Sequence, residues 1–466
     1  KNCRPTWRKK SWPSGEKSRA GEFRFSFAGF YGTIRAEVQT SRLKVILDIG
    51  FLGHAHDERS ARRGAQRVAG NLFAGLRASG TCDLSFVATS HLAGAFDFLA
   101  AQKISPVEKL QCGKFQLQRS RFARGLREKV LRSLPDRRLP VRAWRRLLSE
   151  IIRAATAGEA QLDDAMLAGA DIYHTPHTPF PAAVRRHPRL KKFITLHDFI
   201  PLKTPGYFPG NTRPFMDAVL ECLTPENFAF CVSEVTRADA LNFSKIPPEH
   251  VFVAPLAADK NLFYPESDVE KVASVCRRLA IPPEPYFLAL SAQDRHKNYP
   301  HLIRCFGQLV ESGELTDTNL VIVGPNPDQN TEVVEALAKF PRARARVLVP
   351  GYVADEDLAS VYSGATAFLF PSLAEGFGIP PLEAMQCGTP VIASNTTSIP
   401  EVVGDAGILL CPTDEDSWCQ AMLQINREST LRTQLRQKSL ERSKLFSWER
   451  FIAETLRGYR TAIGLT

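Results

Sequence analysis

Short apolar runs alternate with amphipathic stretches along the chain from residue 43 onwards. Runs of about four to six apolar residues bounded by turn residues are typical of strands buried in a parallel sheet. In the first half they lie at Leu43–Asp48, Leu84–Thr89, Asp171–His174, Phe193–His197, Phe228–Ser233 and Val251–Ala254. In the second half they lie at Tyr286–Leu290, Leu320–Val323, Val347–Val349, Ala367–Phe370, Val391–Ala393 and Gly407–Leu410.

Helical patterns fit between these runs, for example at Asp355–Tyr362 and Leu382–Cys387, and a glycine-containing loop is expected at Gly50–Gly64. Strands that alternate with helices predict parallel sheets, and 466 residues are too many for one ordinary core. We therefore expect two α/β domains, at 43–258 and 259–446. A last helix within 447–466 is expected to pack back on the first domain, and residues 1–42 are expected to be a disordered or non-native extension.

The net charge of +11 indicates an anionic partner, which could be nucleic acid, an acidic membrane surface or a phosphate-bearing substrate. The segment 119–153 interleaves many arginines with apolar residues, so it reads either as a helix lying on an anionic membrane or as an ordinary solvated helix. No nucleic-acid-binding motif occurs. Ten cysteines without a C-x-x-C pair favour reduced thiols in a cytoplasmic protein.

The most informative run spans residues 371–392, where a glycine-rich loop leaves a strand and enters a helix with prolines in its first turn. The start of such a helix offers free backbone N–H groups to an anion, and Gly376 and Gly378 let the backbone approach a ligand closely. Glu375 on the loop and Glu383 in the helix can face one pocket. This pattern indicates a site for a phosphate-bearing ligand with hydroxyl groups.

Other candidate residues follow predicted strands or begin helices. Arg295 and Lys297 could neutralise a diphosphate, although on their own they are better explained as solvated surface cations. His197 and Asp198 end a strand, where open α/β sheets bind ligands. The remaining candidates are Gly64 and Arg67 at a helix start, Gly324 after a strand, and His174 and His177 in the run His-Thr-Pro-His-Thr-Pro.

The run 371–392 resembles the paired-glutamate motif of family 4 of the retaining GT-B glycosyltransferases. The resemblance implies two Rossmann-like domains facing each other across a cleft, with a nucleoside diphosphate sugar as the donor. It places Glu375 beside the donor sugar and Glu383 on the ribose, and it implies that Arg295 and Lys297 neutralise the diphosphate. It assigns the remaining donor contacts to Gly64, Arg67, Gly324, Gly376, Phe377, Gly378 and Ile379.

The run from His197 to Pro201 is similar to that of mannosyltransferase-like members, which implies a mannose-like hexose carried on GDP. The implied catalytic residues are His197, Glu375, Arg295 and Lys297. The acceptor, a glycan or lipid-linked saccharide of surface polysaccharide or lipopolysaccharide assembly, would lie near His174, His177 and Asp198. Such an acceptor implies a cytoplasmic protein that can associate with the inner face of the membrane.

Two alternatives stay open at this point: another enzyme of the same fold, such as a phosphorylase or epimerase, and a non-catalytic basic protein that binds anionic lipid or nucleic acid. No lysine signature for pyridoxal phosphate supports a phosphorylase. The triplets Asp355–Asp357 and Asp414–Asp416 read as D-x-D metal motifs, but both are expected to begin helices, where acids cap N–H groups. We therefore expect neither a metal nor a cofactor.

Overall fold

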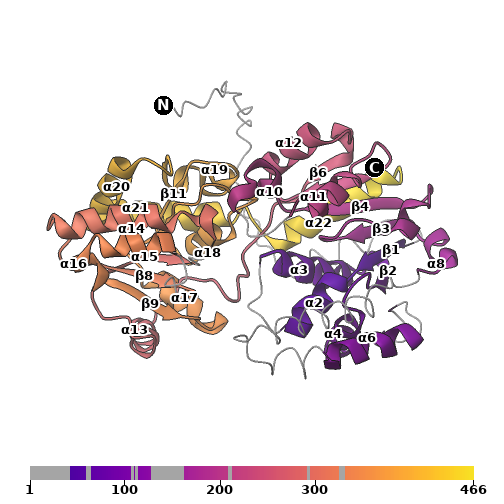
Figure 1. Cartoon of the computed structure of the whole chain (residues 1–466), viewed down its shortest axis with the longest axis horizontal. Helices are drawn as coiled ribbons and strands as arrows, with labels where there is room; N and C mark the ends of the chain where they lie inside the picture. The colour runs from indigo at the N-terminus through magenta and orange to yellow at the C-terminus, as the bar shows by residue number, and fades with distance from the viewer. Residues whose placement is uncertain are drawn as a thin grey trace, which may run out of the picture.

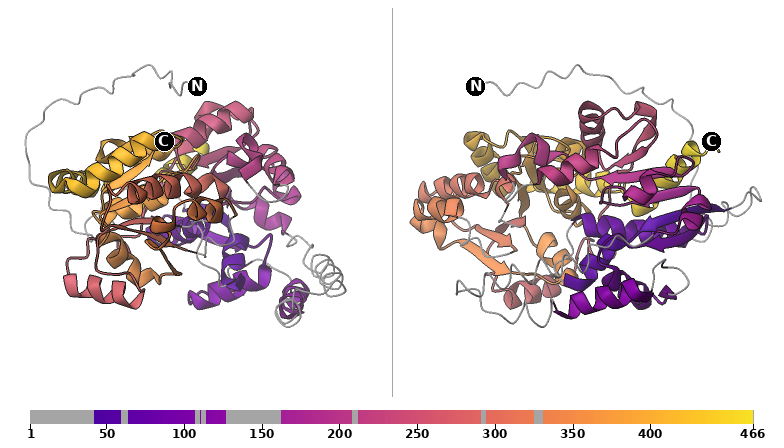
Figure 2. Two further views of the ribbon diagram at one scale, coloured as in Figure 1. Left: turned by 60° about the vertical axis from the view of Figure 1, so that its left-hand side comes forward. Right: turned by 45° about the vertical axis from the view of Figure 1, so that its right-hand side comes forward.

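The computed structural model describes residues 42–58, 64–106, 110, 114–126, 162–207, 212–290, 294–324 and 331–465. Within these ranges the chain forms two α/β lobes that lie side by side (Figure 1). The views in Figure 2 show that each lobe has its own sheet with helices packed on it. The predicted class, two α/β domains built on parallel sheets, is confirmed.

Each lobe contains a six-stranded sheet, and all strand pairs are parallel. The first sheet has the order β2-β1-β3-β4-β5-β6 and the second β12-β11-β10-β7-β8-β9. The strands of the first sheet are β1 (Leu43–Asp48), β2 (Cys82–Val87), β3 (Ile172–Thr175), β4 (Lys191–Leu196), β5 (Phe228–Cys231) and β6 (Val251–Val253). The strands of the second are β7 (Tyr286–Leu290), β8 (Asn319–Val323), β9 (Val347–Gly351), β10 (Ala367–Phe370), β11 (Val391–Ser394) and β12 (Gly407–Leu410).

Helices cover both sheets. Those of the first lobe are α2 (Gly50–Glu58), α3 (Gly64–Ser79), α4 (Leu92–Ala101), α6 (Lys114–Leu126), α8 (Asp164–Ala168), α9 (Ala182–Arg185), α10 (Ile200–Lys203), α11 (Arg213–Leu220) and α12 (Glu234–Phe243). Those that follow are α13 (Val269–Arg278), α14 (Tyr299–Glu311), α15 (Thr331–Ala338), α16 (Pro341–Arg344), α17 (Asp355–Ser363), α18 (Ile379–Gln386), α19 (Ile399–Val403), α20 (Glu415–Arg427), α21 (Ser429–Ser443) and α22 (Trp448–Ala462).

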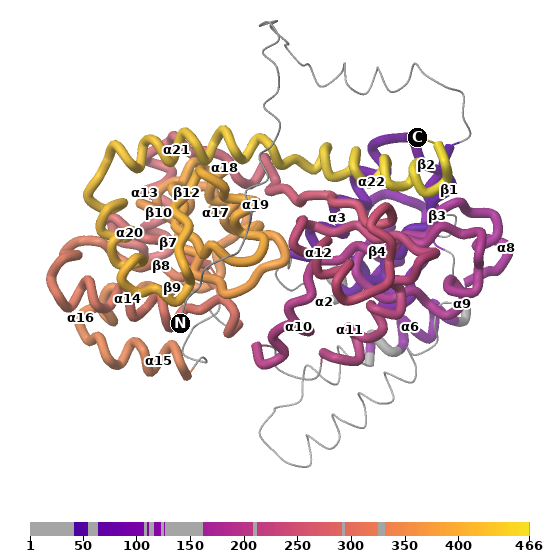
Figure 3. Tube along the Cα trace, turned by 90° about the horizontal axis from the view of Figure 1, so that it is seen from above, coloured from indigo at the N-terminus to yellow at the C-terminus, as the bar shows by residue number. Residues whose placement is uncertain are grey.

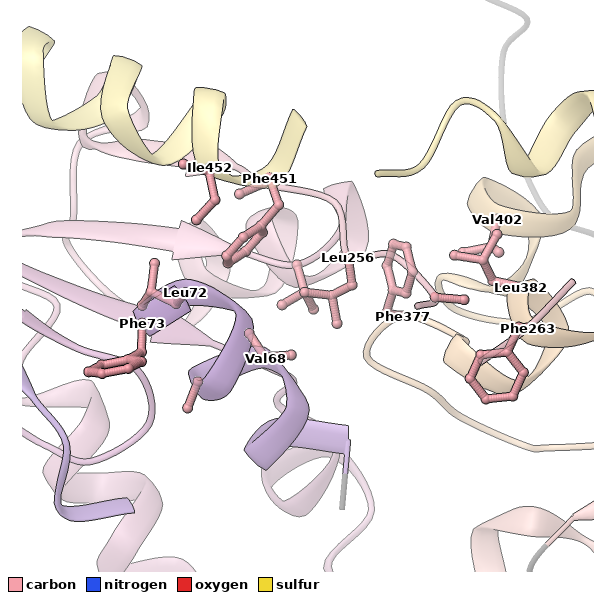
Figure 4. Close-up of a cluster of buried hydrophobic side chains, with 14 of the residues drawn as sticks. Val68, Leu72, Phe73, Leu256, Phe263, Phe377, Leu382, Val402, Phe451 and Ile452 are labelled. Carbon is pink, nitrogen blue, oxygen red and sulfur yellow. The ribbon is translucent and has the colours of Figure 1, made fainter. Parts of the chain in front are cut away.

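The last helix returns to the first lobe. Seen from above, α21 lies on the second lobe and α22 continues onto the first (Figure 3). Phe451 and Ile452 of α22 are buried over α3, beside Val68 and Leu72 (Figure 4). A side chain at Gly75 of α3 would collide with Ile452, so the two helices pack closely. Burial of this apolar surface ties the chain's last helix to the first domain.

The expected loop at Gly50–Gly64 is wrong for its first part, because residues 50–58 form α2. The glycines there serve helix packing: a Cβ on Gly53 would meet the backbone of α4 at His91 and Ala95, and one on Gly50 would meet Ser90. Small residues allow α2 and α4 to approach each other closely. The glycines of this stretch predicted a loop, but they lie where two helices pack closely together.

Two other predictions from the sequence concern residues that lie wholly or mainly outside the described ranges. The extension 1–42 lies outside them except for Arg42. Of the basic segment 119–153, residues 119–126 lie in α6, and the remainder lies outside the described ranges. In α6 the Arg121 guanidinium lies 4.7 Å from the centre of the Phe96 ring of α4, and Phe122 is 68% exposed.

Candidate active site

The loop between β10 and α18, residues 371–378 and here called the donor loop, lies where the second domain meets the first. Gly378 precedes α18 with φ of 114°, a conformation that favours glycine. Pro380 and Pro381 begin the helix, where a missing N–H costs nothing. The Ser398 hydroxyl donates to the carbonyls of Glu375 and Phe377, at 2.9 Å each. The loop is thus held from within its own domain by the residue that precedes α19.

Glu375 and Lys297 form an ion pair at this loop. The Lys297 Nζ lies 2.7 Å from Glu375 Oε1, and the side chains are only 16% and 13% exposed. The Ser372 hydroxyl donates to the same carboxylate oxygen at 2.6 Å. Lys297 also lies 5.4 Å from the centre of the Phe370 ring. The pair is therefore fixed before any ligand arrives.

Arg295 does not share this environment. It lies in the same short 3-10 helix as Lys297 (Arg295–Lys297), but its side chain is 62% exposed and its guanidinium lies 3.0 Å from Glu332 of α15. Asn298 follows in a left-handed conformation, and its amide donates to the carbonyls of Pro371 and Pro412. This anchor brings Lys297 to the donor loop and leaves Arg295 on the solvent side.

Glu383 is buried in α18 and connects the two domains. Its Oε1 lies 2.5 Å from Nη1 of Arg67, which comes from α3 of the first domain, and its Oε2 accepts from the Tyr362 hydroxyl at 3.0 Å. Burial raises the pKa of Glu383, and Arg67 opposes that rise. Arg67 also lies 3.8 Å from Asp355. Glu383, which was expected on the ribose, and Arg67, another expected donor contact, therefore face each other across the domain boundary.

Gly64 and Gly324 were also expected to contact the donor. Gly64 begins α3, and a Cβ there would lie 3.6 Å from Cδ1 of Ile379 in α18. Gly324 follows β8 with φ of 135°, and its N–H donates to the carbonyl of Gly351. Phe377 is buried against Phe446, with ring centres 5.8 Å apart.

His197 follows β4 and reaches the boundary from the other side. Its Nε2 lies 2.9 Å from the carbonyl oxygen of Pro176, and burial lowers the pKa of His197. Because a carbonyl only accepts, the neutral ring must carry its proton on Nε2, which leaves Nδ1 as an acceptor. A Cβ on Gly376 would collide with the His197 carbonyl oxygen. Glycine is therefore required at 376 for the two backbones to meet.

Asp198 lies next to this contact. Burial, and then the nearby charge of Glu375, raises the pKa of Asp198 to about 6. Its Oδ1 accepts from the N–H of Ile200 at 3.0 Å, which opposes the rise. The side chain thus fixes the turn after β4, and its charge is sensitive to pH just below neutrality.

His177 lies in a group of aromatic rings beside His197. Its ring stacks on Phe51 at 4.4 Å between centres and lies 5.4 Å from Phe215 and 5.5 Å from His197. Burial, together with the charge of His197, lowers the pKa of His177 to about 3, so the ring is neutral near pH 7. Phe215 is 39% exposed.

His174 does not fit the acceptor-side position given to it from the sequence. It points into the core from β3, with no exposed surface. One ring nitrogen lies 2.5 Å from the Tyr459 hydroxyl of α22 and the other 2.8 Å from the Thr195 hydroxyl. Burial lowers its pKa to about 3. Because side chains alternate between the faces of a sheet, a strand-end histidine can equally anchor a covering helix.

Sequence reasoning missed Ser372 and Tyr362, which hold the two glutamates. Ser372 lies three residues before Glu375 in the same loop, so its proximity could have been noticed. Tyr362 ends a helix that was expected at Asp355–Tyr362, and nothing local indicates that it would reach Glu383.

Both acid triplets begin helices, as expected. Asp355–Asp357 form the first turn of α17, and Asp414 caps α20 by accepting from the N–H of Ser417. Within the part of the chain that the structure describes, no three His, Cys, Asp or Glu side chains are grouped so as to hold a metal ion. In the same ranges, no helix is both long enough and apolar enough to cross a membrane.

Two parallel-sheet domains that meet at a glycine-rich strand-to-helix loop, with a largely shielded ion pair between a glutamate of that loop and a nearby lysine, are typical of the GT-B class of glycosyltransferases. The family profile of group 1 glycosyl transferases matches residues 277–442. The O-antigen chain mannosyltransferase B of Escherichia coli is 30% identical over 290 residues, which span 62% of this chain and 74% of that protein. The chain belongs to the group 1 glycosyl transferases and is a glycosyltransferase enzyme.

Two further comparisons agree. The serotype-specific mannosyltransferase WbdA of Escherichia coli is 26% identical over 271 residues, 58% of this chain but only 33% of that protein. The crystal structure of a glycosyltransferase from Rickettsia africae covers 92% of this chain and all of its own, with a TM-score of 0.62 at 15% identity, a likeness in fold.

Proposed function

We propose that this protein is a retaining glycosyltransferase of family 4 that transfers mannose from GDP-mannose to a glycan or lipid-linked acceptor. The reaction would belong to the assembly of surface polysaccharide or lipopolysaccharide. The observation that carries the proposal is the half-buried ion pair between Lys297 and Glu375 of the donor loop, 2.7 Å apart, on a loop that meets His197 of the other domain. The similarity to O-antigen mannosyltransferases supports the choice of sugar and of pathway.

On the donor side, the Lys297 ammonium would neutralise charge that builds on the leaving diphosphate. The start of α18 would add backbone N–H groups and the positive end of the helix dipole. Glu383 would accept from the ribose hydroxyls, which requires Arg67 to leave it and turn to the phosphates. Since these groups supply the positive charge, we propose that transfer needs no divalent metal and no other cofactor.

On the acceptor side, the neutral rings of His177, Phe51 and Phe215 would face the incoming sugar. Their apolar faces suit the C–H face of a pyranose, while the Nδ1 lone pair of His197 can accept from a hydroxyl. Asp198 orders the turn that carries this histidine. Such a surface favours a saccharide acceptor over a strongly anionic one.

We also propose that the enzyme works at the cytoplasmic face of the membrane, where a lipid-linked acceptor would lie. Support comes from α6, a helix rich in cations that exposes the ring of Phe122. Each cation near an anionic surface adds about 1 kcal/mol. Flotation with anionic and neutral liposomes tests this at low and high salt. Binding that is equal for both lipids, or absent from both, would contradict it.

The central test is a panel of GDP- and UDP-sugars, with the released nucleoside diphosphate measured over time. The expected result is release from GDP-mannose well above that from the other donors. Glu375→Gln should lose most of this activity, whereas the exposed Glu335→Gln of α15 is the matched control and should keep it. Release from no donor would refute the function, and release from UDP-sugars alone would refute the choice of donor.

A further inference from the structure

Residues at the start of α12, in the first domain, form hydrogen bonds with the donor loop. The Ser233 hydroxyl donates to the carbonyl of Gly376 at 2.7 Å, and the Thr236 hydroxyl lies 3.3 Å from the same oxygen. Both side chains are only 1% exposed. The two hydroxyl oxygens lie 2.9 Å apart, so the single Thr236 hydroxyl proton is shared between this carbonyl and the Ser233 oxygen. The Gly376–Phe377 peptide, one residue after Glu375, is therefore held from the opposite domain.

In a second contact between the domains, a side chain of the second domain binds backbone groups of the first. Glu401 of α19 accepts from the backbone N–H groups of Glu234 and Val235, each at 2.8 Å, one with each carboxylate oxygen. These N–H groups belong to the first turn of α12 and have no partner within the helix. A carboxylate at this end is also stabilised by the helix dipole. A residue of the second domain thus caps a helix of the first.

The two contacts converge on one loop. Glu401 lies three residues after Ser398, which holds the carbonyls of Glu375 and Phe377. On the other side, the Thr236 hydroxyl also lies 3.4 Å from the carbonyl of His197. The start of α12 therefore joins the strand end that carries His197 to the loop that carries Glu375. The bonds from Ser233 and Thr236 to Gly376, and those of Glu401 with the start of α12, need groups from both domains, so they exist only when the domains meet as they do here.

We infer that Ser233, Thr236 and Glu401 are positioning residues, which set the Gly376–Phe377 peptide, next to Glu375, for glycosyl transfer when the two domains close. The inference rests on the proposed function, since it assumes that Glu375 faces the donor sugar. It predicts a particular kinetic signature. Loss of an interaction made on the way to the transition state lowers kcat, while the donor KM changes little.

The decisive variants separate the hydroxyl from the shape of the side chain. Thr236→Val keeps the shape and removes the hydroxyl, whereas Thr236→Ser keeps the hydroxyl. We expect Thr236→Val to lower kcat about three- to tenfold, the range for one neutral hydrogen bond, with donor KM within about twofold. Thr236→Ser should stay within about twofold of wild type. Glu401→Gln should lower kcat on the order of tenfold or more, since it removes a charged acceptor.

A matched control loses a helix cap without touching the loop. Asp268 caps α13, a helix as long as α12, by accepting from the N–H of Lys271 at 3.1 Å. Asp268→Ala should lower thermal stability much as a lost cap does elsewhere, and leave kcat within about twofold. Thermal unfolding of every variant, recorded beside the kinetics, separates loss of fold from loss of positioning.

The outcomes are distinct. Wild-type protein that transfers no sugar would refute the proposed function, and the inference with it. Active wild type with unchanged kcat in Thr236→Val and Glu401→Gln would overturn the inference alone. So would equal losses in Thr236→Val and Thr236→Ser, or losses that follow the unfolding temperature in all variants including Asp268→Ala.

Discussion

Asp198 provides a test of the site's electrostatics that needs no substrate. Burial and the negative charge of Glu375 raise its pKa to about 6, from an ordinary value of roughly 3.9. The perturbation is Asp198→Asn, which keeps an oxygen that can accept from the N–H of Ile200 and cannot ionise. The variant therefore isolates the cost of the buried charge.

The sign follows from proton binding. Between pH 4 and 6 the folded wild type holds a proton on Asp198 that the unfolded chain has lost, so its free energy of unfolding falls as pH rises. A rise of about two units corresponds to about 3 kcal/mol at most. About 2 kcal/mol of this change in the free energy of unfolding falls between pH 4.5 and 7.5. Asp198→Asn should therefore gain about 2 kcal/mol relative to wild type over this range.

The assay is urea unfolding of both proteins at several pH values from 4.5 to 7.5. The difference between the two proteins cancels the titrating groups that do not interact with Asp198. The control is the exposed Asp416→Asn in the first turn of α20, for which the difference should change by less than about 0.5 kcal/mol. The reasoning would be refuted if the difference in free energy of unfolding between wild type and Asp198→Asn did not change with pH, or changed in the opposite direction.

Three further predictions concern the donor. Glu383→Ala should weaken donor binding about ten- to a hundredfold in calorimetric titration, because a charged hydrogen bond to the ribose is typically worth about 1.5–3 kcal/mol; unchanged affinity would argue against the ribose contact. Lys297→Ala should lower kcat by a similar factor and Arg295→Ala by less, because only Lys297 is held on Glu375 while Arg295 is mostly exposed; equal small effects, within twofold of wild type, would contradict the diphosphate role. Activity should survive a chelator, and its complete loss with recovery on adding manganese would show that a metal is needed.

Much of the fold could be predicted because the buried strands are apolar runs. Leu43–Asp48, Tyr286–Leu290, Ala367–Phe370 and Gly407–Leu410 begin and end as the sequence indicated. The donor loop and the start of α18 could be predicted equally well, since their glycines, prolines and glutamates lie within one short run. These features could be predicted because each depends on residues that are close together in the sequence.

What could not be predicted depends on contacts between distant residues. Arg67 and Glu383 are 316 positions apart, and no local pattern indicates that they meet. The same holds for Glu401 and the start of α12. His174 was misassigned because its partners, Tyr459 and Thr195, become neighbours only after the last helix packs back on the first sheet.

The central claim is that sugar transfer takes place where the donor loop meets His197. The most direct measurement is transfer of mannose from GDP-mannose to a saccharide acceptor, with the product's mass and anomeric configuration determined by mass spectrometry and NMR. The account predicts a product one hexose larger with the α configuration of the donor retained, and a loss of at least tenfold in Glu375→Gln. No hexose transfer, or equal turnover by wild type and Glu375→Gln, would contradict it.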